Sequence, residues 1–440
     1  MTAGEPILSS VADIVSMQAS REIELEGHII DSGIMTLVFD RIMDMGGNFE
    51  ILTFDVGKKK TDPSYARLRV VASDPNQLAV ILSDLHRYGA RQLEVDDVHL
   101  VPAEADRVVP KGFYSTTNYP TSVKYRDQWL QVVDNEMDCL IVVDPALMAA
   151  LCTPLSKLKK GDLVVMGEQG VRIIPPERPR EQSTFEFMNG TVSPERPSET
   201  LIRNIAAEIR ELKAKGGKIA LVGGPAIVHT GGDLALARLV REGFIDVIFA
   251  GNALATHDIE YNLYGTSLGM DLSTGKPVVG GHKHHLYAIS EVMRAGSIRA
   301  AVEQGVITGG VMYECISNDI PFVLAGSIRD DGPLPDVITD SMKAQDAIRE
   351  HLRGCGMVLM VATLLHSIAV GNCLGSSVKT ICVDINPSSV TKLMDRGTMQ
   401  AIGIVSDAGT FLPLLAEQLI PDFRTRVIKP DTKSPIQTVE

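Results

Sequence analysis

Polar residues suited to proton transfer follow an apolar run in the C-terminal half of the sequence. The run DVIFAG ends at Gly251, and the next nine residues include Asn252, His257, Asp258 and Glu260. A histidine among carboxylates can move protons near neutral pH, and an asparagine amide can hold a ribose or a carboxamide. The plainer interpretation is that Asp258 and Glu260 belong to the solvated first turn of a helix. Both interpretations stay open at this point, with His257, Asp258 and Glu260 as candidates for proton transfer.

A second polar loop is the segment AGSIRDDGPLPD. It contains Arg329, Asp330 and Asp331 between glycine and proline residues. The two carboxylates can bind a substrate ammonium group or the hydroxyls of a ribose. An Asp-Gly turn accounts for the same residues without any ligand.

Two acids end apolar runs near the C-terminus. Asp384 closes the run TICVD, and Asp407 follows the run IGIVS. A carboxylate at the end of a strand commonly binds the ribose hydroxyls of a dinucleotide. Asn386 and Pro387 indicate a helix start, since asparagine favours the N-cap and proline the first helical position. These two strand ends, preceded in the sequence by the histidine-containing loop TLLHSIAVGN, are the strongest evidence for a dinucleotide site.

Two further motifs are less specific. The segment KIALVGGPAIVHTGG lets a phosphate approach the backbone, but it lacks G-x-G-x-x-G and also fits a simple tight turn. In GHKHHLY, the spacing of His282, His284 and His285 suits zinc, yet no second Cys or His cluster supports it. We expect no metal and regard these histidines as solvated or facing the substrate.

Alternating helical and strand patterns over residues 201–430 predict a parallel sheet with helices on both faces. Such sheets bind ligands at the carboxyl ends of their strands, where the polar segments lie. Residues 22–100 show the order β-α-β-β-α-β, typical of a ferredoxin-like or ACT-like α+β module. The predicted divisions are a leader at 1–20, the α+β module at 21–105, a small β-rich domain at 106–178, a linker at 179–200, an α/β domain at 201–430 and a tail at 431–440.

The composition excludes several classes of protein. The 440 residues carry a net charge of −13 without a Lys/Arg-rich stripe, which disfavours nucleic acid and anionic membranes as partners. No uninterrupted apolar stretch of about 18 residues occurs, and the N-terminus does not resemble an export signal. Six cysteines are scattered without a Cys-x-x-Cys pair, as in proteins with free thiols in a reducing compartment. We therefore expect a soluble, cytoplasmic protein.

At these residues the sequence resembles the archaeal-type ornithine cyclodeaminase family, which carries the LOR/SDH bifunctional enzyme conserved domain. It is similar to the C-terminal part of the cyanobacterial arginine dihydrolase/ornithine cyclodeaminase. The arginine dihydrolase domain of that fusion is absent, so the resemblance implies no hydrolysis of a guanidine group. The matching segments, spread from about residue 20 to residue 420, are ELEGHIIDSGIM, GGPAIVHTGG, AGNALATHDIE, GTSLGMD, AGSIRDDGPLPD, TLLHSIAVGN, CVDINPSSVTKLMDRG and IVSDAG.

The resemblance implies a deoxyhypusine-synthase-like NAD-binding domain, which would account for the missing G-x-G-x-x-G motif. The positions that match the family's NAD contacts are Asn252, Ala253, Asp331, Thr363, Leu364, Leu365, His366, Asp384, Asp407 and Ala408.

The resemblance also implies conversion of L-ornithine to L-proline and ammonia, with NAD as a catalyst that borrows and returns a hydride. We then expect His257, Asp258 and Glu260 to move protons and Asp330 to hold an ammonium group. A homo-oligomer is expected. Two other functions stay open: an NAD-linked amino-acid oxidoreductase of the saccharopine or opine type, and a non-enzymatic amino-acid sensor.

Overall fold

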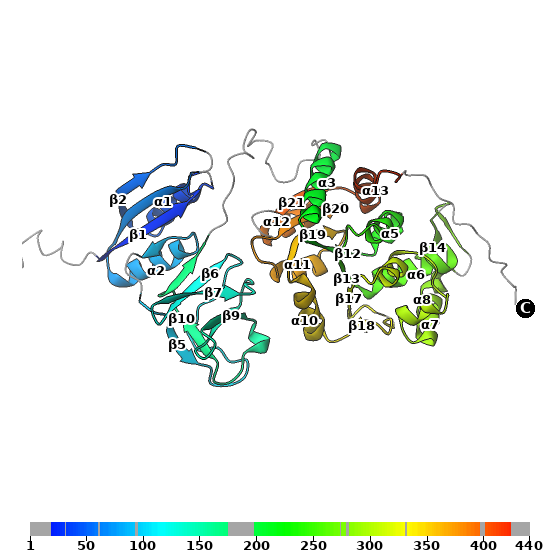
Figure 1. Ribbon diagram of the computed structural model, residues 1–440, viewed down its shortest axis with the longest axis horizontal. Helices are drawn as coiled ribbons and strands as arrows, with labels where there is room; N and C mark the ends of the chain where they lie inside the picture. The colour runs from blue at the N-terminus through cyan, green and yellow to red at the C-terminus, as the bar shows by residue number, and fades with distance from the viewer. Residues whose placement is uncertain are drawn as a thin grey trace, which may run out of the picture. The chain divides into compact units, whose positions relative to one another are not determined.

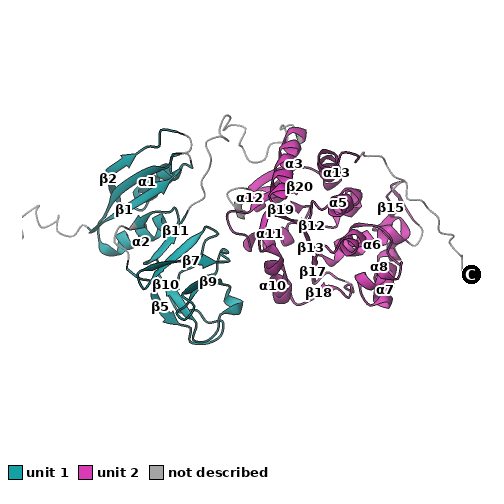
Figure 2. Ribbon diagram, in the orientation of Figure 1, with its two compact units in different colours: residues 1–187 teal, residues 188–440 magenta. Residues whose placement is uncertain are grey.

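The computed structural model divides into two compact units, residues 1–187 and 188–440 (Figure 2). It describes residues 19–30, 32–59, 62–92, 96–174, 198–272, 274–278, 281–330, 332–396 and 401–423. The predicted tail, the leader up to residue 18 and the linker up to residue 197 lie outside the described residues.

The first part of unit 1 is an antiparallel sheet in the order β2-β3-β1-β4. Alternate residues of β3, such as Leu68 and Val70, are buried and pack with α1 and α2 in one core. Asp74 caps α2 by accepting the backbone N–H groups of Asn76 and Gln77. The elements are β1 (Ala19–Gly27), α1 (Ile34–Asp44), β2 (Asn48–Asp55), β3 (Ser64–Ala72), α2 (Pro75–His86) and β4 (Arg91–Gln92).

The second part of unit 1 is a seven-stranded sheet in the order β11-β6-β7-β9-β8-β10-β5. Strand β5 starts at His99 and pairs with β10 of this sheet, so the sheet begins before the predicted boundary at residue 105. A local pattern predicts a strand but not the sheet that it joins. The elements are β5 (His99–Pro102), β6 (Thr121–Tyr125), β7 (Gln128–Val133), β8 (Leu140–Asp144), β9 (Ala149–Thr153), η2 (Leu155–Lys157), β10 (Leu163–Met166) and β11 (Val171–Ile173).

Unit 2 is built on a parallel sheet in the order β18-β17-β13-β12-β19-β20-β21 (Figure 1). This confirms the predicted α/β architecture. The chain runs outward from β12 to β18 and then returns to the other side of β12, so its direction reverses between β12 and β19. The strands are β12 (Lys218–Gly223), β13 (Val247–Gly251), β17 (Phe322–Ala325), β18 (Val337–Ile338), β19 (Cys355–Val361), β20 (Lys379–Asp384) and β21 (Ala401–Val405).

Helices cover both faces of this sheet, because successive side chains of the buried strands point to opposite sides. Ile219 and Leu221 of β12 pack in a core with α3, α5 and α13, whereas Ala220 and Val222 pack in a core with α10, α11 and α12. Figure 1 shows α5 and α13 on one side of the sheet and α10 and α11 on the other.

The helices of unit 2 are α3 (Ser198–Ala214), α4 (Ala226–His229), α5 (Asp233–Arg241), α6 (Asn252–Tyr264), η5 (Gly281–Lys283), α7 (His284–Ala295), α8 (Ile298–Glu303), α9 (Val311–Ser317), α10 (Ser341–Leu352), α11 (Leu365–Asn372), α12 (Pro387–Arg396) and α13 (Ala408–Leu419). A small sheet follows α6 and consists of β14 (Thr266–Ser267), β15 (Met270–Asp271) and β16 (Lys276–Pro277).

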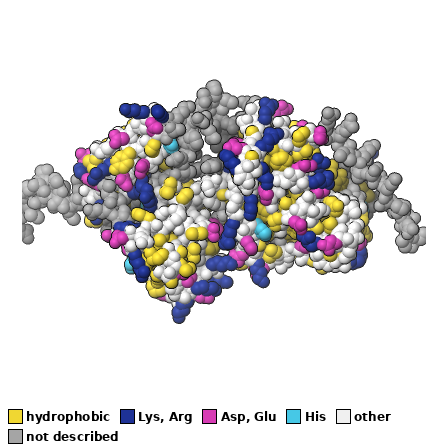
Figure 3. Space-filling model, in the orientation of Figure 1, with side chains coloured by type: hydrophobic (Ala, Val, Ile, Leu, Met, Phe, Trp, Pro, Cys, Tyr) yellow, Lys and Arg dark blue, Asp and Glu magenta, His cyan; other side chains and the backbone are white. Residues whose placement is uncertain are grey.

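The described surface is mixed in charge. On the face shown in Figure 3, basic and acidic side chains are interspersed over both units. Within the described ranges, every helix is too short or too polar to cross a membrane.

Candidate active site at the carboxyl edge of the parallel sheet

Two loops meet in direct backbone contact where the chain reverses direction in the sheet. The backbone N–H of Gly224, after β12, donates to the carbonyl of Val361 at the end of β19, at 3.0 Å. A Cβ atom on Gly224 would lie 1.9 Å from the carbonyl oxygen of Ala362. Only glycine fits there. Open α/β sheets bind ligands at such a reversal point, so the carboxyl edge of this sheet is the candidate site.

His366, the second residue of α11, lies beside this reversal point. Its Nδ1 is 3.4 Å from the hydroxyl oxygen of Thr363, and its ring lies against the backbone of Gly251. Burial lowers the pKa of His366, and the nearby carboxylate of Asp330 opposes that shift. Asp330 is held in its loop by the backbone N–H of Ser327, 2.7 Å from its Oδ2. The structure therefore brings Asp330, Thr363 and His366 together, while Asp331 lies outside the described residues.

Asn252 and Ala253 open α6 directly after β13. The first backbone N–H groups of α6 have no side-chain cap and lie at the carboxyl end of the strand, which favours an anion there. The side chain of Asn252 is buried, and its Oδ1 accepts the backbone N–H of Leu334 at 3.0 Å and the hydroxyl of Thr256 at 3.3 Å. The Asn252 oxygen therefore fixes a neighbouring loop, a role that the sequence does not reveal.

The two strand-end acids lie on adjacent strands. Asp384 ends β20 and uses Oδ1 to accept the backbone N–H of Asn386 at 2.8 Å. Asp407 precedes α13, and its side chain does not cap that helix. Ala408, the first residue of α13, is buried. Because β20 and β21 pair in parallel, both acids lie at the same edge of the sheet as His366.

Apolar side chains stand exposed beside these acids. Leu365 is 74% exposed and Ile385 is 71% exposed. Leu364, the residue before α11, is half-buried. An exposed apolar side chain beside a polar site offers a surface on which a flat base can lie.

A histidine and a glutamate of α6 form a buried pair next to this edge. Nδ1 of His257 lies 2.7 Å from Oε2 of Glu260, and Glu260 is fully buried. Burial raises the pKa of Glu260, but the hydrogen bonds from His257, Thr266 and the backbone N–H of Gly269 outweigh it and hold the pKa below its usual value. An ionised Glu260 orients the imidazole, so Nε2 of His257 is the nitrogen left for a substrate.

Three residues from other elements complete the surroundings of this pair. The hydroxyl of Thr266 donates to Oε1 of Glu260 at 3.0 Å and lies 2.7 Å from Nδ1 of His284. The ring of His229 is 4.8 Å from that of His257, and its Nδ1 is 2.7 Å from the hydroxyl of Ser267. Burial, followed by the proximity of His257, lowers the pKa of His229 to about 4, so His229 is neutral at physiological pH.

Asp258 points away from the histidine pair. Its two carboxylate oxygens accept the backbone N–H groups of Val311 and Met312, each at 2.8 Å, and so cap α9. The side chain is 1% exposed, and burial raises the pKa of Asp258. This geometry indicates a structural role for Asp258 and sets it apart from His257 and Glu260.

One segment, residues 224–232, which includes α4, lies between the His257–Glu260 pair and the strand-end residues. Its N-terminal end contacts the β19 loop at Gly224, and its middle contains His229. A Cβ on Gly409 would lie 2.1 Å from the carbonyl oxygen of Thr230, and one on Gly232 would lie 3.1 Å from that of Ala408. This segment therefore contacts both the loops that contain predicted cofactor residues and the His257–Glu260 pair.

Sequence reasoning left His229 and Thr266 without an assigned role, and it regarded His284 only as solvated or facing the substrate. His229 carried a usable signal, because it follows β12 at the same edge as the other candidates. Thr266 carried none, since its contacts with Glu260 and His284 depend on how the small sheet and α7 pack. Among the described residues, no group of three or more His, Cys, Asp or Glu side chains is arranged to hold a metal ion.

Three family models match nearly the whole chain. Residues 203–415 match the Rossmann-fold C-terminal region of arginine dihydrolase ArgZ-like proteins, and residues 120–202 match the first region of the same C-terminal part. Residues 20–119 match the LOR/SDH bifunctional enzyme conserved region.

Curated relatives agree with these matches. The chain is 60% identical over 405 residues to the ornithine cyclodeaminase of Methanocaldococcus jannaschii, covering 91% of this chain and 96% of that protein. It is 45% identical over 422 residues to the bifunctional arginine dihydrolase/ornithine cyclodeaminase AgrE of a Nostoc species, covering 94% of this chain and 60% of that protein.

Solved structures are similar too. A conserved LOR/SDH protein from Methanococcus maripaludis S2 has 57% identity and a TM-score of 0.71, covering 74% of this chain and 98% of that one. ArgZ, an arginine dihydrolase of cyanobacteria, has 41% identity and a TM-score of 0.80, covering 96% and 61%. The ternary complex of AgrE with ornithine and NAD+ has 44% identity and a TM-score of 0.50, covering 91% and 57%. The chain therefore belongs to the family of archaeal ornithine cyclodeaminases, which is shared with the C-terminal part of cyanobacterial ArgZ-like proteins.

Proposed function

We propose that this chain is an NAD-dependent ornithine cyclodeaminase, which converts L-ornithine to L-proline and ammonia. Its 60% identity to a protein named ornithine cyclodeaminase supports the proposal, as does its 44% identity to AgrE, whose structure contains ornithine and NAD+. Within this chain, the supporting observation is that segment 224–232 lies against both the His257–Glu260 pair and the residues after the strands.

The carboxyl edge fits a dinucleotide in three respects. Asp384 has one oxygen, Oδ2, without a hydrogen-bond partner among the described residues, as a ribose hydroxyl requires. The uncapped start of α6 provides backbone N–H groups for a phosphate. Leu365 and Ile385 provide exposed apolar surface for a base. We assign NAD binding to this edge, with Asp407, Ala408 and the segment 363–366 completing it.

The chemistry that bound NAD supplies is acceptance of a hydride from the α-carbon of ornithine and its return after ring closure. His257, oriented by Glu260, takes a proton from the α-ammonium so that the nitrogen lone pair can assist loss of the hydride. The δ-ammonium group gives a proton to solvent, and the resulting δ-amine attacks the α-carbon. The ring nitrogen then loses a proton to solvent, and the same imidazole returns its proton to the α-nitrogen, which leaves as ammonia. Asp330 holds the ammonium group of the substrate during binding.

Ornithine carrying deuterium at the α-carbon tests this reaction. Purified protein with NAD+ should release one ammonia for each proline, and the proline should keep the deuterium at C2, because a hydride on nicotinamide does not exchange with water. Loss of the label to solvent would contradict a borrowed hydride. A net rise in NADH absorbance would favour the saccharopine or opine type of oxidoreductase, and amino-acid binding without ammonia would favour a sensor.

A further inference from the structure

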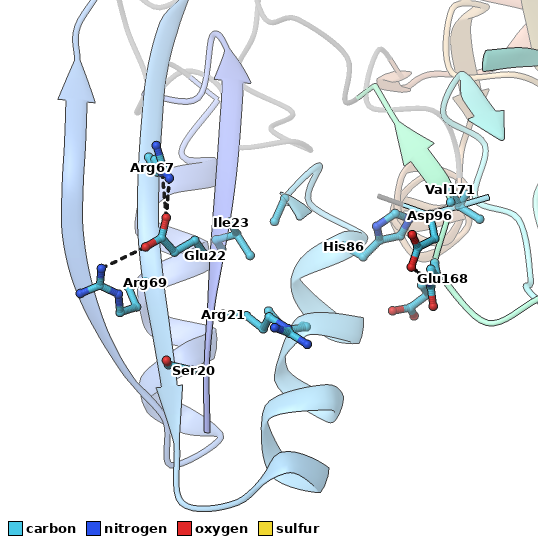
Figure 4. Close-up of a pocket in the computed structure, with 14 residues that line it drawn as sticks. Ser20, Arg21, Glu22, Ile23, Arg67, Arg69, His86, Asp96, Glu168 and Val171 are labelled. Carbon is cyan, nitrogen blue, oxygen red and sulfur yellow. Dashed lines mark hydrogen bonds and ion pairs between the residues drawn. The ribbon is translucent and has the colours of Figure 1, made fainter. Parts of the chain in front are cut away.

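Unit 1 contains a cavity of about 570 Å³ that takes no part in the site described above (Figure 4). Its described lining comes from the start of β1, Arg67 and Arg69 of β3, the end of α2 with Ala90, Asp96, and the segment 168–171 that leads into β11. It therefore lies where the two parts of unit 1 meet, and most of its lining side chains are polar.

The two sides of β1 present different charges to this cavity. Glu22 points toward Arg67 and Arg69 and pairs with them at 2.6 and 3.0 Å, and Arg69 also pairs with Glu50 at 2.7 Å. Arg21 points to the opposite side of the strand, toward α2 (Figure 4). In the described part of the chain, no hydrogen bond or ion pair engages its guanidinium. Arg21 is therefore an uncompensated cation on the cavity wall.

A buried acceptor without a donor lies on the same wall. The side chain of His86 is 8% exposed, and its Nε2 has no hydrogen-bond partner among the described residues. Burial lowers the pKa of His86 to about 4, although a hydrogen bond to the backbone of Ala90 acts in the opposite direction. The imidazole is therefore neutral, its other nitrogen donates to Ala90, and Nε2 is a bare acceptor. Leaving such an acceptor unpaired is costly, so a ligand that donates a hydrogen bond there is favoured.

Two carboxylates lie near His86 (Figure 4). Glu168 is half-buried and accepts the hydroxyl of Ser83, and Asp96 accepts the side-chain amide of Gln169 at 2.7 Å. Arg67 and Arg69 are balanced by Glu22 and Glu50. Outside the lining, Arg87 lies near Glu168, whose pKa burial raises. Among the lining side chains themselves, those without an opposite charge are one cation, Arg21, and two acids, Asp96 and Glu168. Their net charge of about −1 is complemented by a ligand with one carboxylate and two ammonium groups.

We propose that this cavity is a second ligand site, which binds a free basic α-amino acid. Arg21 binds the carboxylate, and His86 Nε2, Glu168 and Asp96 receive the cationic groups. The site is independent of the reaction proposed for unit 2, so each can fail without the other.

Calorimetric titration of the full chain with L-lysine, without NAD, tests the proposal. Lysine is only one methylene longer than ornithine, so the substitutions in unit 1 and unit 2 are what separate this site from an ornithine site, and analogues of lysine test the individual contacts. Cadaverine lacks the carboxylate and 6-aminohexanoate lacks the α-ammonium group, so each should bind about tenfold or more weakly than L-lysine. Arg21→Gln should weaken L-lysine binding by about tenfold or more and leave cadaverine binding unchanged. Glu168→Gln should weaken both.

Two further variants locate the ligand. Arg107→Gln, which changes an exposed arginine of unit 1 outside the cavity lining, should bind L-lysine like the unaltered chain. Asp384→Ala should also keep L-lysine binding, since that residue belongs to unit 2. The proposal is overturned if neither L-lysine nor L-arginine binds. It is equally overturned if binding survives both cavity substitutions or is lost in Asp384→Ala.

Discussion

The backbone of Gly251 supports the imidazole ring of His366: a Cβ added at Gly251 would lie 3.0 Å from Cε1 of that ring. Gly251 ends β13 and His366 follows β19, and the middle strand β12 lies between these two strands. The contact therefore links the ends of two strands that do not pair with each other. It sets the position of the histidine loop relative to the start of α6.

Gly251→Ala should displace His366 without disturbing the fold, because the backbone at Gly251 is in an extended conformation that alanine adopts freely. An off-rotamer histidine costs about 0.5–1.5 kcal/mol, and NAD affinity should fall by the corresponding factor. Calorimetry measures the affinity, and circular dichroism checks the fold. An unchanged affinity would mean that the position of His366 does not matter for the cofactor.

Asp384→Ala should weaken NAD binding by about 1.5–3 kcal/mol, the value of a hydrogen bond to a charged group. Asp422→Ala is a matched control, since Asp422 is an exposed acid of the same unit away from the strand ends. Titration of both variants with NAD decides the point. If the folded Asp384 variant binds like the control, Asp384 is not part of the site.

His257→Ala should lower kcat by about 10²- to 10⁴-fold, the usual contribution of a general acid–base group, while NAD affinity changes little. Glu260→Gln should give a smaller loss, because the amide still accepts the hydrogen bond from His257 but carries no charge. His99→Ala, an exposed histidine of unit 1, serves as the control. Steady-state rates and NAD titrations separate the two effects. A His257 variant that loses NAD binding and turnover in equal measure would point to a binding role.

Asp258→Ala should lower the free energy of unfolding. Removing the carboxylate leaves the backbone N–H groups of Val311 and Met312 without acceptors in a buried place, at a cost of about 2–4 kcal/mol. Urea unfolding measures this loss. Turnover should decline only as the folded fraction declines, unlike in His257→Ala. A variant that is as stable as the unaltered chain but inactive would indicate that Asp258 takes part in the reaction.

Asp233→Asn should stabilise the protein more at high pH than at low pH. Asp233 is 1% exposed, and burial raises its pKa to about 6 although the backbone N–H groups of Asp233 and Leu234 oppose that shift. The folded state thus binds this proton more tightly than the unfolded state, and the stability it contributes is lost as pH rises through about 6. The advantage of the Asn variant should grow by about 1.4 kcal/mol between pH 5 and pH 8. Urea titrations of both proteins at the two pH values test this, and an equal difference at both would disprove the raised pKa.

The parallel sheet was predictable because strands buried on both faces read as apolar runs that end in polar residues, as TICVD does at Asp384. The different roles of neighbouring residues in α6 were not predictable. His257, Asp258 and Glu260 are neighbours in sequence, but successive residues of a helix point about 100° apart. Which of them meets an imidazole and which caps another helix depends on where α9 and the small sheet pack. Those contacts join residues up to 54 positions apart, and no local pattern encodes them.

The three loops around the reversal point touch through main-chain atoms at Gly224, Gly232 and Gly409. A contact between main-chain atoms is not adjusted by exchanging side chains. A substitution at these three glycines can therefore only disrupt the packing of the loops. A change in nucleotide preference, whether by evolution or by design, must therefore come from residues at the edge of the site. Leu365 and Ile385 are exposed after β19 and β20, so their side chains can be exchanged without disturbing these main-chain contacts.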